Sequence, residues 1–415
     1  MSILQSLQKT HAAAKQLAAL SDFARRALLL DLAKLIEHSQ SEILEANAKD
    51  LAAFVANDPK RDRLSLDANR LDALALSIRH IAQLDDPVGI SYLDKILPNG
   101  LHLRKIAVPM GVVGVIYESR PNVTLDVAAL CFRSANACVL RGGSEAWHSN
   151  QLLVRLIQKA LVENQLSPDL VCLLPPDRSL LPEFLAANRW VDLLIPRGSD
   201  SLIQYVRANS TIPTIETGAG VVHTYVEESA QLDMATNIVV NAKVSRPSVC
   251  NALDCLLVDA TVAEAFLPML SKGLLDHSVV IHADPVAYST LKNAGYPHLI
   301  QAVEDDFGKE WLGFELTIKC VAGPDEALEH ISTYSSKHSE AIVTENHEVK
   351  NRFLFEVDAA AVYVNASTRF TDGGEFGLGA EIGISTQKLH ARGPFALEKL
   401  VTEKWIVYGK GQIRE

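Results

Sequence analysis

From about residue 108 onward, apolar runs of strand length alternate with segments that have the pattern of helices. The first run, GVVGVIY over 111–117, precedes a predicted helix over 121–134 that a proline opens at its first turn. Further strands are expected at 137–140, 170–174, 191–195 and 214–216, and further helices at 147–163 and 200–208. This alternation is typical of a doubly wound, mostly parallel sheet, which binds ligands at the carboxyl ends of its strands.

A second alternating unit runs from Ala252 to about Val364. A helix is expected before it, over 231–239, and strands are expected at 252–258, 317–321 and 341–344. The glycine-rich residues 366–395 predict a loop followed by a helix. The fold class is therefore α/β, with two doubly wound domains.

The domain boundaries follow from these patterns. Residues 1–91, rich in Ala and Leu with charges at helical spacing, predict helices that join 109–229 in the first, cofactor-binding domain. The catalytic domain is expected at 230–372, and 373–400 is expected to be a return segment. Residues 92–108 predict a hairpin around Asn99-Gly100, and the alternating tail within 401–415 predicts an edge strand. Exposed strands of this kind invite pairing with another chain.

Composition and charge exclude several classes of function. The formal net charge of −11 leaves no general basic surface for nucleic acid. No apolar run approaches the ~20 residues that a membrane span needs, and the N-terminal residues lack a signal pattern. Six cysteines without a CxxC motif indicate a reduced, cytoplasmic protein. The 13 histidines show no HExxH and no pairing at ligand spacing, so no metal site is expected.

The stretch NAKVSRPSVCNALD, residues 241–254, contains a candidate nucleophile. Cys250 follows the cations Lys243 and Arg246, which would favour the reactive thiolate. The alternative is that Cys250 is a small buried hydrophobe, as most unpaired cysteines are. Its place just before a strand, at the start of the second domain, is where a cleft between two domains would put it.

The first domain lacks the GxGxxG motif of a standard dinucleotide-binding loop, because the residues from Glu118 to Pro121 occupy the first turn. The second strand ends in Arg141, followed by Gly142, Gly143 and Ser144. An arginine at this position suits the 2′-phosphate of NADP, whereas an acid suits the ribose of NAD. The alternative is a solvated loop arginine.

These pieces, in this order and over essentially the whole chain, resemble the aldehyde dehydrogenase superfamily. The segments ESRPN, SRPSVCN and SSKHSEAIVT resemble more narrowly the branch that reduces L-glutamate 5-phosphate. The resemblance implies an aldehyde dehydrogenase-like fold whose hairpin and C-terminal strand form an oligomerisation arm. It also implies a homo-oligomer that uses NADP(H), and it makes the upstream glutamate kinase a candidate partner.

The resemblance also assigns residues. It places the nucleophile on Cys250 and cofactor contacts on Arg141, Gly142, Gly143, Ser144, Gly198, Ser199 and Glu310. Two positions depart from aldehyde oxidisers. Ser119 stands where those enzymes have an oxyanion-binding asparagine, so the resemblance implies that the Cys250 backbone amide holds the oxyanion, with help from Ser119 or Asn122. The general base falls on Glu216, although a reductase must avoid hydrolysing its thioester.

The implied reaction is reduction of L-glutamate 5-phosphate by NADPH, through a cysteinyl thioester, to L-glutamate 5-semialdehyde and phosphate. This is the second step of proline biosynthesis from glutamate. Candidate substrate contacts are Lys243, Arg246, His223, Arg369 and Asp372. The alternatives are irreversible oxidation of a small semialdehyde and a non-catalytic protein on the same fold.

Overall fold

The computed structural model describes residues 2–54 and 60–414, which divide into two compact units. The first unit comprises 1–217, 377–383 and 395–415, and the second comprises 218–376 and 384–394. Residues 1, 55–59 and 415, which fall in the predicted first domain and arm, lie outside the described residues. No helix in the described part of the chain is both long and apolar enough to cross a membrane.

The boundary between the units falls at 217/218 and not at the predicted 229/230. The reason is that β7 (His223–Val226) pairs with β8 (Cys255–Asp259) and β12 (Ser339–Val343) of the second unit. The predicted return segment 373–400 is likewise divided between the two units. The first difference arises from pairing between residues distant in sequence, which local patterns do not reveal.

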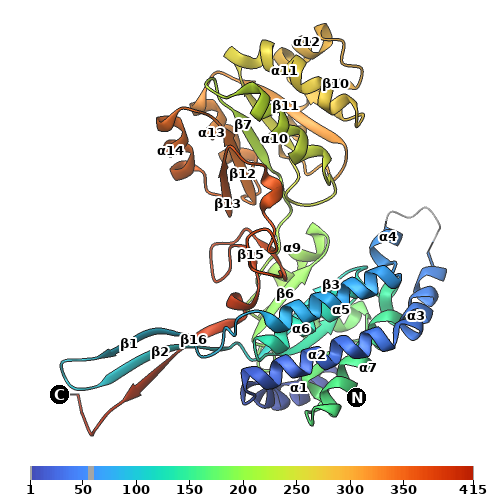
Figure 1. Ribbon diagram of the computed structural model, residues 1–415, viewed down its shortest axis with the longest axis vertical. Coiled ribbons are helices and arrows are strands. Elements are labelled where there is room, and N and C mark those ends of the chain that lie inside the picture. Colours follow the sequence, from blue (N-terminus) through green and yellow to red (C-terminus); the bar gives the residue numbers. More distant parts are fainter. Residues whose placement is uncertain (1, 55–59, 415) are drawn as a thin grey trace. The chain divides into compact units, whose positions relative to one another are not determined.

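The first unit contains a four-stranded parallel sheet in the order β5-β4-β3-β6. Its strands are β3 (Val112–Tyr117), β4 (Ala137–Arg141), β5 (Val171–Leu173) and β6 (Leu193–Arg197). Its helices are α1 (Ile3–Ala18), α2 (Asp22–His38), α3 (Gln40–Ala52), α4 (Lys60–Leu64), α5 (Ala68–Gln83), α6 (Pro121–Arg133), α7 (Trp147–Glu163), α8 (Leu181–Leu185) and α9 (Asp200–Asn209). Helices α6 and α7 pack on the sheet, and α2 and α5 pack on these helices (Figure 1).

Local sequence explains most of these elements. Every residue of β3 is buried, as the apolar run predicts for a central parallel strand. Pro121 occupies the first turn of α6, where a missing backbone N–H costs nothing. The expected strand at 214–216 is reduced to a single bridge between Leu194 and Thr214.

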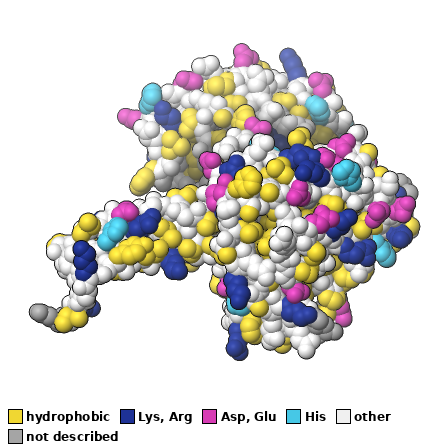
Figure 2. Space-filling view, turned by 60° about the horizontal axis from the view of Figure 1, so that its bottom comes forward, with side chains coloured by type: hydrophobic (Ala, Val, Ile, Leu, Met, Phe, Trp, Pro, Cys, Tyr) yellow, Lys and Arg dark blue, Asp and Glu magenta, His cyan; other side chains and the backbone are white. Residues whose placement is uncertain are grey.

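The predicted hairpin and tail strand are confirmed as one antiparallel sheet. It consists of β1 (Ser91–Ile96), β2 (His102–Pro109) and β16 (Val401–Tyr408) in that order. Gly100, with φ of 81°, makes the turn. The sheet projects as an arm whose surface mixes apolar and charged side chains (Figure 2). Its exposed apolar residues are Tyr92, Ile96, Trp405, Val407 and Tyr408.

The second unit contains a seven-stranded parallel sheet in the order β10-β9-β11-β8-β7-β12-β13. Its remaining strands are β9 (Val280–Ala283), β10 (Leu299–Gln301), β11 (Glu315–Val321) and β13 (Ala361–Val364). Its helices are α10 (Leu232–Val244), α11 (Ala260–Leu275), α12 (Pro285–Asn293), α13 (Pro324–Tyr334) and α14 (His347–Glu356). The prediction of two α/β domains with parallel sheets is therefore confirmed.

The two faces of this second sheet have separate cores. Leu256 and Val258 of β8 pack with residues of α10, α11 and α12, whereas Cys255 and Leu257 pack with residues of α13 and α14. This is the alternation expected of a strand that is buried on both sides.

The helix predicted within 366–395 is wrong. The structure has a single 3-10 turn at Thr368–Phe370, then irregular chain and the short strand pair β14 (Gly383–Ser385) and β15 (Gly393–Phe395). Glycines at 373, 374, 377, 379 and 383 disfavour a helix here, because glycine loses more backbone entropy than other residues do.

Candidate active site

Cys250 lies in the loop between α10 and β8 of the second unit and is half-buried. The backbone of Gly220 passes directly against this loop. A Cβ atom at residue 220 would lie 1.7 Å from the carbonyl oxygen of Cys250, so only glycine fits there. The ETGAG segment therefore supports the backbone of the candidate nucleophile.

Asn251, the next residue, ties this loop to the segment 368–371. Its side-chain amide donates to the carbonyl oxygens of Thr371 at 2.9 Å and Arg369 at 3.3 Å. The hydroxyl of Thr368 donates to the backbone oxygen of Asn251 at 2.8 Å. These bonds bring Arg369, 119 positions after Cys250 (369 − 250 = 119), to the same loop.

Arg369 is the main cation of this cluster. Its guanidinium donates to the Asn251 side chain and, at 3.1 Å, to the hydroxyl of Ser245. Burial lowers the pKa of Arg369 and neighbouring Arg246 lowers it further, while Cys250 and Asp372 raise it. Arg369 therefore lies close enough to both Cys250 and Arg246 to interact with them electrostatically. Arg246 and Arg369 are both predicted substrate contacts. Asp372 is exposed and accepts from the backbone of Gly374 at 2.8 Å.

Lys243 is not available to the substrate as predicted. Its side chain is fully buried, with Nζ 2.7 Å from the carbonyl oxygen of Leu253 and 3.7 Å from the carboxylate of Asp254. Asp254 also accepts from the backbone of Trp311 at 3.0 Å. The pair anchors the end of the Cys250 loop in the sheet, which is a structural role.

His223 is also misplaced for substrate binding. It is the first residue of β7 and is 0% exposed, with its ring against Cys255, His330 and Glu340 inside the second unit. Glu310, predicted to contact the cofactor, accepts a hydrogen bond from the backbone of Gly220 at 2.8 Å. Glu310 therefore contacts the backbone of Gly220, which in turn lies against the Cys250 loop.

In the first unit, Ser119 is held by Glu145. The backbone N–H and the hydroxyl of Ser119 both donate to the same carboxylate oxygen at 2.7 Å. These bonds stabilise the unusual positive φ of 40° at Ser119. Asn122, in the first turn of α6, donates to Asp126 at 3.1 Å, and burial raises the pKa of Asp126 to about 6.

Glu216, the predicted general base, lies 3.6 Å from the guanidinium of Arg207 on α9. Its side chain is 21% exposed. Arg207 is therefore a cationic neighbour of this carboxylate within the first unit.

The carboxyl end of β4 carries the residues predicted to bind the cofactor. Arg141 is 8% exposed and donates to the carbonyl oxygens of Pro176 at 3.1 Å and Asp177 at 3.4 Å. Its buried Nε has no hydrogen-bond partner among the described residues. Burial lowers the pKa of Arg141, and nearby Arg178 contributes to the same direction. Two guanidinium groups and an unsatisfied donor fit a phosphate.

The neighbouring loops complete this edge of the sheet. Gly142 and Gly143 pack against the side chains of Asn150 and Glu145, and Ser144 begins a 3-10 turn. Ser199 is the N-cap residue of α9, next to Gly198. Its backbone and hydroxyl donate to Glu118 at 3.1 and 3.4 Å. A pyrophosphate at this helix end would take over those donors from the carboxylate.

Three residues of these sites were missed from the sequence: Asn251, Glu145 and Glu118. Asn251 carried a signal, because it is the polar residue that separates Cys250 from an apolar run. Glu145 and Glu118 are single acids in loops, and their roles appear only when the chain folds.

Comparison with known proteins places the chain among its relatives. Residues 2–285 match the aldehyde dehydrogenase family. The gamma-glutamyl phosphate reductase of Chlorobium phaeobacteroides is 50% identical over 413 residues, covering 99% of both chains. That of Legionella pneumophila is 49% identical over 415 residues, covering 100% of this chain and 99% of the relative.

The solved structures agree. The crystal structure of gamma-glutamyl phosphate reductase from Thermotoga maritima superimposes with a TM-score of 0.96 at 40% identity, covering 100% of both chains. Family membership implies a nicotinamide cofactor. The chain belongs to the aldehyde dehydrogenase family and, within it, to the gamma-glutamyl phosphate reductases.

Proposed function

We propose that the protein reduces L-glutamate 5-phosphate to L-glutamate 5-semialdehyde and phosphate, with NADPH as the reductant. The observation that carries this proposal is the half-buried Cys250 in a loop tied to Arg369, with Arg246 nearby. A thiolate near two guanidinium groups, of which Arg369 is held by hydrogen bonds, suits a substrate with a phosphate and a carboxylate. The names of the relatives supply the identity of that substrate.

In the first step, the Cys250 thiolate attacks the acyl carbon. The bond between that carbon and the phosphate oxygen breaks, and inorganic phosphate leaves with the electron pair. Arg246 and Arg369 stabilise the charge on the phosphate and hold the substrate's carboxylate. A thioester on Cys250 remains.

In the second step the thioester carbon is reduced. NADPH, when bound, supplies the hydride. Donors of the chain stabilise the resulting oxyanion, and the backbone amide of Cys250 is the candidate within the second unit. Roles for Ser119 and Asn122 toward this oxyanion remain predictions. The carbon–sulfur bond then breaks, which returns the thiolate and releases the aldehyde.

The preference for NADPH rests on Arg141. Its guanidinium is nearly buried and lies near Arg178, and its Nε has no partner among the described residues, which suits the 2′-phosphate. Ser144, Gly198 and Ser199 are the further candidates at the strand ends. The role of Glu310 toward the cofactor remains a prediction, as does a role for Glu216 in proton handling.

The arm formed by β1, β2 and β16 supports a homo-oligomer, because its exposed apolar side chains and strand edges are typical of pairing surfaces. None of the six cysteines, all within the described residues, is in a disulfide. A mechanism that needs the Cys250 thiolate fits a reducing compartment such as the cytoplasm. Contact with the glutamate kinase remains a prediction.

Replacement of the nucleophile tests the proposal. Cys250→Ser should abolish NADP⁺ reduction by L-glutamate 5-semialdehyde in the presence of phosphate, while NADPH binding, followed by fluorescence titration, stays within twofold of wild type. Cys320→Ser, a buried cysteine on β11, is the matched control and should keep its activity. Substantial turnover by Cys250→Ser would refute the covalent mechanism.

A further inference from the structure

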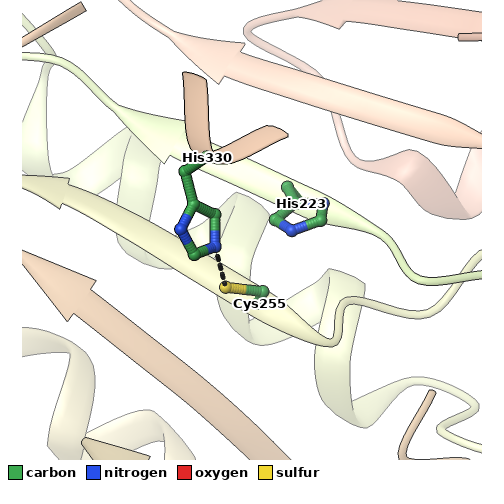
Figure 3. Close-up of side chains that lie close together, drawn as sticks. All are labelled: His223, Cys255 and His330. Carbon is green, nitrogen blue, oxygen red and sulfur yellow. Dashed lines mark hydrogen bonds between the residues drawn. The ribbon is translucent and has the colours of Figure 1, made fainter. Parts of the chain in front are cut away.

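Three strands of the second unit place a row of polar side chains in its interior. His223 on β7 is the register partner of Cys255 on β8 and of Glu340 on β12. Register partners in a parallel sheet point to the same face. Helix α13 covers this face and contributes His330 (Figure 3). All four side chains are at least 96% buried, because none is more than 4% exposed.

Two imidazoles and a thiol converge in this row. The Cys255 sulfur lies 3.6 Å from Nε2 of His330, and one ligand atom from each of His223, Cys255 and His330 lies within 4.8 Å of the others (Figure 3). In a tetrahedral zinc site with bonds of about 2.3 Å to sulfur and about 2.0 Å to nitrogen, ligand atoms are about 3.5 Å apart. The cysteine–histidine pair already has this separation. The other separations, none above 4.8 Å, must close by at most about 1.5 Å.

Glu340 orients one of the imidazoles. Its carboxylate lies 3.1 Å from Nδ1 of His223 and accepts from the His223 backbone at 2.9 Å, and Ser335 donates to its other oxygen. Metal-binding histidines usually present their second ring nitrogen to a carboxylate in this way. Nε2 of His223 is thereby directed away from Glu340.

Several buried ring nitrogens in this row lack hydrogen-bond partners among the described residues. Both ring nitrogens of His223 and Nδ1 of His330 have no hydrogen-bond partner among the described residues, although both rings are buried. Nδ1 of His223 lies 3.1 Å from the Glu340 carboxylate, at an angle that does not make a hydrogen bond. An unsatisfied buried polar group is costly, so native proteins rarely keep several together. A metal ion would satisfy Nε2 of His223. The rings of Phe307 and Tyr334 pack around His330 and make its surroundings largely apolar.

Metal binding requires each ligand atom to be deprotonated. Ligation therefore sends the thiol proton of Cys255, and any proton on Nε2 of His223, to solvent.

We infer that His223, Cys255 and His330 form a binding site for a divalent transition metal of the zinc class. Mixed thiolate and imidazole ligands suit Zn²⁺ and exclude the oxygen-seeking Mg²⁺ and Ca²⁺. The sequence-based argument against a metal relied on ligands close together in the chain, whereas these three lie on β7, β8 and α13. This metal site is distinct from the candidate active site, because its thiol is Cys255 and not Cys250.

The position of the site gives it a consequence for the candidate active site. Cys255 follows the Cys250 loop directly, and His223 follows Gly220, whose backbone supports that loop. A metal ion would join β7, β8 and α13 where the loop enters the sheet. Binding should therefore stabilise the folded chain, as any ligand of the native state does.

Cobalt substitution tests the inference directly. The full-length, metal-depleted protein is titrated with Co²⁺ under reducing conditions, and the thiolate-to-cobalt charge-transfer absorption is recorded. We expect one Co²⁺ per chain with this absorption, retained in Cys250→Ser and Cys320→Ser and lost in Cys255→Ser. Absence of the absorption in wild type, or its loss in Cys250→Ser but not in Cys255→Ser, would overturn the site.

Two further variants keep the test decisive if Cys255→Ser fails to fold. Glu340→Gln should weaken Zn²⁺ binding about 10–100-fold, as loss of an orienting carboxylate does. His330→Gln should remove the increase in Tm that Zn²⁺ produces in wild type, with its circular dichroism unchanged. Equal Zn²⁺ affinity in wild type, Glu340→Gln and His330→Gln would show that the ion binds elsewhere.

Discussion

Gly220→Ala should disable the enzyme without removing any chemical group. The added Cβ would lie 1.7 Å from the carbonyl oxygen of Cys250, 2.6 Å from its carbonyl carbon and 2.9 Å from its Cα. Ordinary contacts between such atoms are about 3.5 Å, so the two backbone segments must separate by about 1.5 Å or more. All three clashing atoms are backbone, so a side-chain rotation cannot relieve the overlap.

A displacement of this size should reduce kcat strongly. Misplacing a reacting group by about 1 Å can cost about 100-fold in rate, and Gly220→Ala moves the backbone that carries the Cys250 sulfur. We therefore expect at least about a 100-fold decrease in kcat for phosphate-dependent NADP⁺ reduction, with slower alkylation of Cys250. Circular dichroism establishes that the variant is folded.

The matched control is Gly313→Ala in the same unit. The nearest atom to its added Cβ is the Trp311 oxygen at 3.6 Å, an ordinary contact, so activity should stay within twofold of wild type. A Gly220→Ala variant as active as Gly313→Ala would refute the account of how the Cys250 loop is supported.

Three further predictions follow from burial, charge and the arm. Asp254→Asn leaves Lys243 buried without its carboxylate, which should lower the free energy of unfolding in urea by about 3–5 kcal/mol. A loss below 1 kcal/mol would contradict this. Burial lowers the pKa of His338 to about 4 from its usual 6.5. The unfolded chain therefore takes up this proton first as the pH falls. Above pH 6.5 the ring has no effect on the free energy of unfolding, and between pH 6.5 and pH 4 its burial lowers that free energy by about 3 kcal/mol. His338→Gln should therefore reduce the difference between the free energies of unfolding measured in urea at these two pH values. A His338→Gln variant with the wild-type pH dependence would show that the ring is protonated in the fold. Deletion of 401–415 removes β16 from the arm and should convert an oligomer to smaller species in sedimentation velocity, whereas an unchanged sedimentation coefficient would exclude the arm from assembly.

Local patterns predicted much of the fold because they depend on neighbouring residues. The buried run at 112–117, the proline that opens α6 and the Asn99-Gly100 turn each determine their conformation within a few positions. The glycine-rich region 366–395 was misjudged. It forms two short strands that pair with each other, where its glycine-rich composition had suggested a loop and a helix.

The candidate site was predictable in part. Cys250 and Arg246 share one loop, so their proximity could be inferred from the sequence. The burial of Lys243 and His223 could not, because it depends on Asp254 and on the pairing of β7 with β8 and β12. A charged residue near a nucleophile in sequence is as readily an anchor of the loop as a ligand for the substrate.

The requirement for phosphate tests the central claim most directly. The wild-type protein is supplied with L-glutamate 5-semialdehyde and NADP⁺, and formation of NADPH is followed with and without inorganic phosphate. If Cys250 forms a thioester that phosphate must cleave, sustained NADPH formation requires phosphate, and without it at most one equivalent per active site appears. An equal steady rate without phosphate, with glutamate as the product, would show that water cleaves the thioester and that the protein is an aldehyde-oxidising enzyme.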